Sequence, residues 1–234
     1  MGSKQSKIFF MIQTIRQAVI VGFVLLAGVG SVSDVQAQFS VGVRAGGHIS
    51  RYLFSDPLYE EAVQYRGYFQ AAVPVELSLT ESLSLQAELQ YLQKGVRLFS
   101  RDQTDYSDYR INNHVLEIPL LIKKNFSEWE SELSLFAGPA LAWYLTGRVR
   151  HDYTQMQVPG KENERIDYKG YNRWDLDLQL GGEFAWPVGD EMELFLDARY
   201  HLGLLNFDYL ASVEADRIRA RGISLSFGAR RNWE

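Results

Sequence analysis

The chain has 234 residues, no cysteine and a formal net charge of −5. Without thiols it cannot form a disulfide scaffold, use a cysteine nucleophile or bind a metal through cysteine. Its acidic balance argues against a nucleic-acid-binding surface, so we expect no nucleic acid among its partners.

Residues 1–37 have the composition of a secretory signal peptide. Lys4, Lys7 and Arg16 precede an uncharged apolar stretch centred on residues 18–30, and small and polar residues ending at Ala37 follow. The alternative is a membrane-anchor helix, but the apolar stretch is shorter than the roughly 20 residues that a spanning helix needs. We therefore predict cleavage after Ala37 and one domain over residues 38–234.

After residue 37, apolar and polar side chains alternate over eight segments. Period-two alternation places every second side chain on the same face of a β-strand. The third segment is also rich in helix formers, but five consecutive period-two matches favour a strand. The expected strands are residues 39–50, 67–79, 83–94, 116–123, 133–145, 174–186, 192–202 and 223–233.

The connectors between these segments alternate in length. Three short ones follow the second, fourth and sixth segments, as periplasmic turns would if both termini lie in the periplasm. The four long ones are then extracellular loops, and we expect the polar run at 157–169 to be mobile. The long connectors lie near residues 51–66, 99–113, 147–172 and 207–220.

The pattern predicts an all-β fold: an eight-stranded, antiparallel, up-and-down barrel in the outer membrane. One face of the segments is apolar, as lipid contact requires, whereas a soluble barrel, the alternative, would have a polar outer face. Aromatic residues also gather near both ends of the strands, as in the girdles of membrane barrels. They are Phe39, Phe126, Trp129, Trp186 and Trp233 near the periplasmic ends, and Phe69, Phe99, Trp143, Trp174, Tyr200 and Phe207 near the outer ends.

Charged residues recur on the inward face of the predicted strands. An eight-stranded barrel is only wide enough for side chains to fill its interior, so we expect poor conduction of solutes. Unpaired charges in such an interior would be costly, which favours ion pairs among them. The inward charges are Arg44, Glu76, Glu88, Glu117, Lys123, Asp175, Asp177, Glu183, Asp197 and Arg199.

The same interior offers one candidate for catalysis. His48 and His201 are inward near the outer ends of their strands, as are Asp175 and Asp177. A histidine with an aspartate could activate water or a hydroxyl group, which would make the protein a hydrolase at the barrel rim. We favour structural packing of these residues, and expect a non-enzymatic protein with no catalytic residue, cofactor or metal site.

Several stretches carry a family resemblance over nearly all of the expected mature chain. They are VGVRAGGHIS (41–50), LQAELQYLQKG (85–95), LEIPLLIKKNF (116–126), LFAGPALAWYL (135–145) and LDLQLGGEF (176–184). The chain resembles the PorT-like outer-membrane β-barrel proteins of Bacteroidetes. The final segment resembles the signal read by the outer-membrane insertion machinery, although Glu234 follows Trp233 here.

The resemblance implies a structural or interaction component, and an accessory role in protein secretion. The expected partners are outer-membrane lipid, the insertion machinery during assembly, and a secretion-system or periplasmic partner at the turns. The alternative is an adhesion or binding barrel that acts through its surface loops.

Overall fold

The computed structural model describes residues 39–54, 61–101, 105–128, 131–155, 158–166, 168, 173–205 and 218–233. The predicted signal peptide, Trp129, Phe207 and Glu234 lie outside these residues. No helix in the described ranges is long and apolar enough to cross a membrane.

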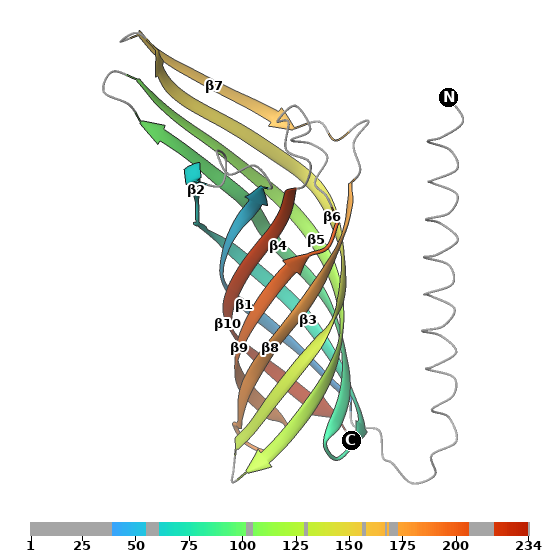
Figure 1. The fold of residues 1–234 in the computed structure, drawn as a ribbon. Helices are drawn as coiled ribbons and strands as arrows, with labels where there is room; N and C mark the ends of the chain where they lie inside the picture. Colours follow the sequence, from blue (N-terminus) through green and yellow to red (C-terminus); the bar gives the residue numbers. More distant parts are fainter. Residues whose placement is uncertain are drawn as a thin grey trace, which may run out of the picture. The chain divides into compact units, whose positions relative to one another are not determined.

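Eight long strands form a closed antiparallel barrel (Figure 1). Each pairs with the next along the chain, and pairing of the first with the last, from Phe39 opposite Trp233 to Phe54 opposite Ile218, closes the wall. The predicted eight-stranded meander is therefore confirmed. The strands are β1 (Phe39–Phe54), β3 (Arg66–Thr80), β4 (Leu83–Arg101), β5 (Tyr106–Glu128), β6 (Ser131–Gln155), β8 (Trp174–Pro187), β9 (Met192–Gly203) and β10 (Ile218–Trp233).

Along most of the barrel the outward face is apolar and the inward face is polar. On β5, Ile118 and Ile122 are 53% and 62% exposed, whereas the charged Glu117 and Lys123 are fully buried. A protein in water would not leave such a surface uncovered. The outer face is suited to lipid, and the predicted alternation is confirmed.

Parts of the predicted extracellular loops are β-strand instead. β4 continues to Arg101 and β5 begins at Tyr106, inside the predicted loop 99–113, and two further strands lie in predicted loops: β2 (Val63–Gln64) and β7 (Val158–Ile166). β7 pairs with the extended end of β6, within the predicted mobile run. Hydrogen bonding to a neighbouring strand stabilises these polar segments as sheet, although they lack the apolar face that marks the membrane strands.

The projecting sheet, as we call the outer ends of β4, β5 and β6 together with β7, extends beyond the barrel wall at the upper left of Figure 1. β5 has 23 residues and β6 has 25. A transmembrane strand needs only about 9–11 residues. More than half of each strand therefore lies outside the span that a membrane requires.

Aromatic side chains mark both ends of the apolar outer face. At the outer end, Trp143 and Trp174 lie with ring centroids 4.5 Å apart, and at the inner end Phe39 and Trp233 lie 6.0 Å apart. Short turns connect the strands at this inner end, as in the periplasm-facing end of such barrels.

Candidate functional site

The barrel interior is filled by three groups of ion pairs stacked along its axis. The group nearest the inner end centres on Lys123 and Arg230. Lys123 Nζ lies 2.7 Å from Glu183 Oε1 and 2.9 Å from Glu76 Oε2, and Arg230 Nε lies 2.6 Å from Glu193 Oε2. Arg230 Nη2 also lies 3.8 Å from Glu132 Oε1, so six strands meet in this group.

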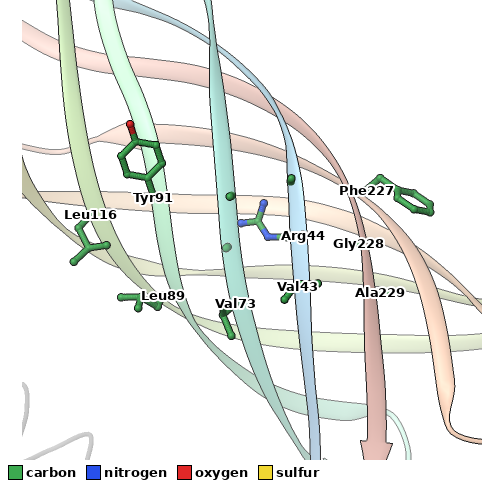
Figure 2. A pocket seen from close by; sticks show the side chains of 12 residues that line it. Val43, Arg44, Val73, Leu89, Tyr91, Leu116, Phe227, Gly228 and Ala229 are labelled. Atoms are coloured by element: carbon green, nitrogen blue, oxygen red, sulfur yellow. The ribbon is translucent and has the colours of Figure 1, made fainter.

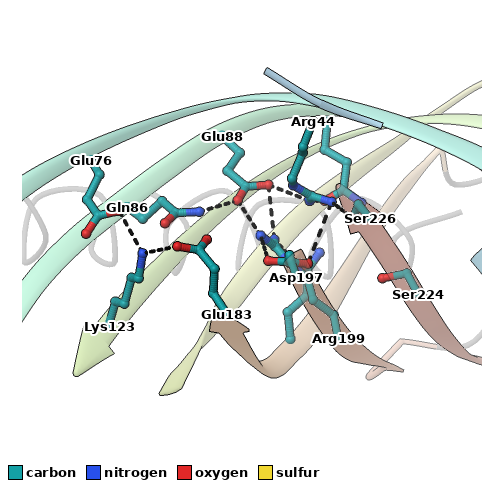
Figure 3. Close-up of polar contacts among 12 residues, drawn as sticks. Arg44, Glu76, Gln86, Glu88, Lys123, Glu183, Asp197, Arg199, Ser224 and Ser226 are labelled. Carbon is teal, nitrogen blue, oxygen red and sulfur yellow. Dashed lines mark hydrogen bonds and ion pairs between the residues drawn. The ribbon is translucent and has the colours of Figure 1, made fainter. Parts of the chain in front are cut away.

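The middle group joins two arginines through one glutamate (Figure 3). Glu88 accepts hydrogen bonds from Arg44 Nη2 at 2.7 Å and from Arg199 Nη2 at 2.6 Å. Arg199 also pairs with Asp197 at 2.7 Å, and its guanidinium lies 4.8 Å from the centroid of the Phe136 ring. All four charged side chains are completely buried.

The group nearest the outer end centres on Lys94. Its ammonium lies 2.5 Å from Glu117 Oε1 and also bonds to Asp177. The alternation placed both carboxylates and Lys94 inward, but Lys94 and Arg230 were left out of the set of inward charges. Their parity on the strands was the signal that identifies them as inward.

A cluster of apolar side chains, the outer cap, closes the interior beyond Lys94. It lies farther along the same strands: Val96 follows Lys94 on β4, and Ile111 and Val115 precede Glu117 on β5. Asn113 donates a hydrogen bond to the Tyr52 hydroxyl at 2.9 Å and accepts one from Tyr168 at 2.6 Å. The cap consists of Tyr52, Val96, Ile111, Val115, Ala142, Tyr144, Val149, Ile166, Tyr168, Ile218 and Ala220.

The structure brings the two predicted histidines together, beneath this cap rather than at an open rim. The His48 and His201 rings are perpendicular, with centroids 4.9 Å apart, and His201 Nε2 lies 3.0 Å from Ser224 Oγ. His201 Nδ1 has no hydrogen-bond partner among the described residues, so no carboxylate orients the ring as a hydrolytic triad requires. Asp175 instead accepts a hydrogen bond from Tyr144 at 3.4 Å.

One group of described residues has the ligand types of a metal site. Ligand atoms of Glu117, Asp177 and His201 lie within 4.8 Å of one another. The Lys94 ammonium binds both carboxylates, so a cationic group already holds the position that a metal ion would need. A metal would have to displace a buried lysine.

The lipid-facing surface has a shallow apolar hollow across β10, β1, β3, β4 and β5 (Figure 2). It has a volume of about 660 Å³. Small side chains at Ala45, Ala71 and Ala229 form its floor, and Leu89, Leu116 and Phe227 stand around it. Because alanines rather than bulky residues occupy these outward positions, the hollow has room for an apolar ligand.

Farther out on the same face, arginines line a second hollow of about 180 Å³. Asp108 accepts hydrogen bonds from Arg97 Nη2 at 2.8 Å and from Arg110. Hydrogen bonding from Arg97 holds the pKa of Asp108 well below its usual range. The hollow is lined by Arg66, Arg110, Asn112, Arg148, Arg150 and Asn163. Sequence reasoning did not single out these arginines, because it read their segments as loops.

Comparison with known proteins finds similar solved structures and one family model. Among solved structures, the chain is similar to Neisserial surface protein A, with 13% identity, 82% of this chain and 96% of that chain covered, and a TM-score of 0.44. It is also similar to the outer membrane protein OprG from Pseudomonas aeruginosa, with 8% identity, 83% of this chain and 96% of that chain covered, and a TM-score of 0.44. A third similar structure is the outer membrane protease OmpT from Escherichia coli, with 11% identity, 88% of this chain and 100% of that chain covered, and a TM-score of 0.45. No curated protein sequence matches the chain.

A family model matches residues 34–209, which is well over half of the sequence. The match agrees with the closed wall, the apolar outer face and the ion-paired interior described above, which place the protein in the outer membrane as an integral component. The chain therefore belongs to the outer membrane protein beta-barrel domain family.

Proposed function

We propose that this protein is a non-conducting, non-enzymatic barrel that holds the projecting sheet outside the membrane for contact with another protein. The length of β5 and β6 carries the proposal, since each far exceeds what a membrane span needs. A barrel that served only as an anchor would have no use for four paired strands beyond the membrane.

The filled interior supports the non-conducting part of the proposal. Three groups of ion pairs and the outer cap occupy the space through which a solute would pass. We expect no conductance steps when the purified barrel is inserted in planar lipid bilayers. Stable, voltage-independent steps at the amplitude of an open pore would contradict this part.

The burial of His48, His201 and Asp177 supports a non-enzymatic role, because an outside substrate would have to pass the outer cap. The competing rim-hydrolase hypothesis predicts turnover of peptide or ester substrates by the purified barrel. We expect none above background, and equal background in a His201→Ala, Asp177→Ala double variant. Turnover that this double variant abolishes would establish the hydrolase instead.

The sheet itself is tested by shortening its outermost hairpin. Residues 150–163 can be replaced by a two-residue turn, because the residues just before this segment on β6 pair with those just after it on β7, as Val149 does with Glu164. In cells carrying a photo-crosslinking residue at the exposed position of Tyr106, we expect a crosslinked partner with the full chain and its loss with the short hairpin. Identical crosslinks from both would contradict a role for the hairpin.

A narrower version of this function makes the protein an accessory of secretion, as the PorT-like resemblance implies. Comparison of secreted proteins from a deletion strain and its parent tests it. Cargo retained in the periplasm would support the secretion role. An unchanged secretome would favour surface binding or adhesion through the projecting sheet.

A further inference from the structure

The projecting sheet has one basic face and one acidic face. Residues directly opposite one another in antiparallel strands share a face, and Arg148 lies opposite Arg165, while Arg110 lies opposite both Arg97 and Arg150. The basic face carries Arg97, Arg101, Arg110, Arg148, Arg150, Lys161 and Arg165, with Asp108 and Asp152 as its carboxylates. Glu162 and Glu164 alternate with these residues and lie on the other face.

The basic face continues the lipid-facing surface of the barrel. On β5, the outward side chains run from Leu116 in the apolar band through Asn112 to Arg110. Leu116 and Asn112 are four residues apart, which is roughly 13 Å along a strand. Arg110 lies two residues beyond Asn112, so the basic face begins just past the apolar band.

Two of the four arginines that line the second hollow lack a carboxylate partner among the described residues. Arg66 and Arg148 form no ion pair with any described residue, although both line the hollow of about 180 Å³. Arg150 pairs with Asp152 and remains 44% exposed. The hollow thus offers converging guanidinium groups with net positive charge, on a protein whose formal net charge is −5.

We infer that this surface binds a phosphorylated lipid of the outer leaflet, with the phosphate at the arginine hollow and an acyl chain in the apolar hollow. Arginine is suited to phosphate because its planar N–H groups can form two parallel hydrogen bonds. The two hollows lie on the same face of the protein. On β5, Leu116 lines the apolar hollow, and Asn112 and Arg110, farther out on the same strand, line the arginine hollow. Charge and apolar surface together match an amphiphile better than a free anion.

The test measures lipid binding to the full barrel by native mass spectrometry from detergent. The probes are lipid A with two phosphates, the same lipid without phosphates, and inorganic phosphate alone. The variant is Arg110→Gln, Arg148→Gln, Arg150→Gln. Its control is Lys124→Gln, Arg231→Gln, which removes two exposed outward cations at the other end of the barrel.

We expect the triple variant to bind bisphosphorylated lipid A roughly a hundredfold more weakly, at about fivefold for each basic residue near an anionic surface. The control should bind it as the parent does. Ala71→Trp, which fills the apolar hollow, should weaken lipid binding and leave the arginine hollow intact. A difference in migration on denaturing gels between unheated and boiled samples checks that each variant is folded.

Three results would overturn the inference. Equal affinity for the lipid with and without phosphates would remove the arginines from recognition. Unchanged lipid binding in the triple variant would do the same. If inorganic phosphate binds as tightly as the lipid and Ala71→Trp has no effect, the ligand is a free anion and not a lipid.

Discussion

The two halves of β5 differ in which face is apolar. Within the membrane, Leu120 and Ile122 face outward and Lys123 faces inward, whereas in the projecting sheet Arg110 faces outward and Ile111 is buried. The backbone alternation is the same in both halves. The difference shows that the surrounding solvent, lipid or water, decides which parity carries the apolar side chains.

The largest effect that tests this comparison comes from a buried charge. Glu88→Gln leaves Arg44 and Arg199 without their shared carboxylate in a completely buried site. We expect the free energy of unfolding to fall by about 3–5 kcal/mol, the usual cost of an uncompensated buried charge. Urea unfolding of the barrel in lipid vesicles measures it, and a loss under about 1 kcal/mol would mean that the interior is more hydrated than the ion pairs indicate.

A charge on the outer surface tests the other side of the comparison. Leu120→Arg places a cation in the middle of the lipid-facing band, where Leu120 is 42% exposed. The expected loss is about 2–4 kcal/mol for arginine near the bilayer midplane. Tyr106→Arg, outward on the same strand but in the projecting sheet, is the control and should change stability by less than about 0.5 kcal/mol. Equal losses of stability in the two variants would show that Leu120 and Tyr106 face the same solvent.

The smallest effect is expected at the counterpart of Glu88 in the projecting sheet. Asp108 also joins two arginines, but Arg97 and Arg110 are 35% and 28% exposed, so Asp108→Asn should cost only about 1 kcal/mol or less. Amide hydrogen exchange of β4 and β5 would report it. A loss as large as that of Glu88→Gln would show that the sheet is shielded from water.

The Asp108 carboxylate also makes the stability of the projecting sheet depend on pH, with a known sign. Its folded pKa lies below the value of about 3.9 for an unperturbed aspartate, so its stabilising contribution is complete above that pH and is lost as the pH falls through the folded value. Exchange protection of the sheet in the parent should therefore persist at pH 4 and decline below it. The Asp108→Asn variant should lack this decline.

The barrel could be predicted because lipid imposes a strict period of two on each spanning strand. The alternation located all eight strands and assigned inward positions correctly for the predicted inward charges and for His48 and His201. The partners of each charge could not be predicted, because the stagger of the strands decides which inward residues share a level. Arg199, for instance, meets Glu88 from a strand on the far side of the barrel.

The projecting sheet was missed because its outward side chains are polar and its buried side chains are apolar, the reverse of the pattern in the membrane strands. Val149, His151 and Tyr153 alternate with Arg148, Arg150 and Asp152 as a strand would, but polar residues outnumber apolar ones, as in a loop. Most of the outer cap was missed for the same reason, because all of its members except Ala142 and Tyr144 lie outside the predicted strands. Continued alternation beyond the apolar band was the signal available in the sequence.

The pairing of β1 with β10 also constrains how the protein reaches this structure. Phe39 and Trp233 are neighbours in the wall, although they are 194 positions apart along the chain. Because contacts between distant residues form slowly, the wall can close only after the last strand has been synthesised and has found the first. Until that step, both edges of the unfinished sheet can pair with other chains, so the interval between synthesis and closure is when this protein is most prone to aggregate.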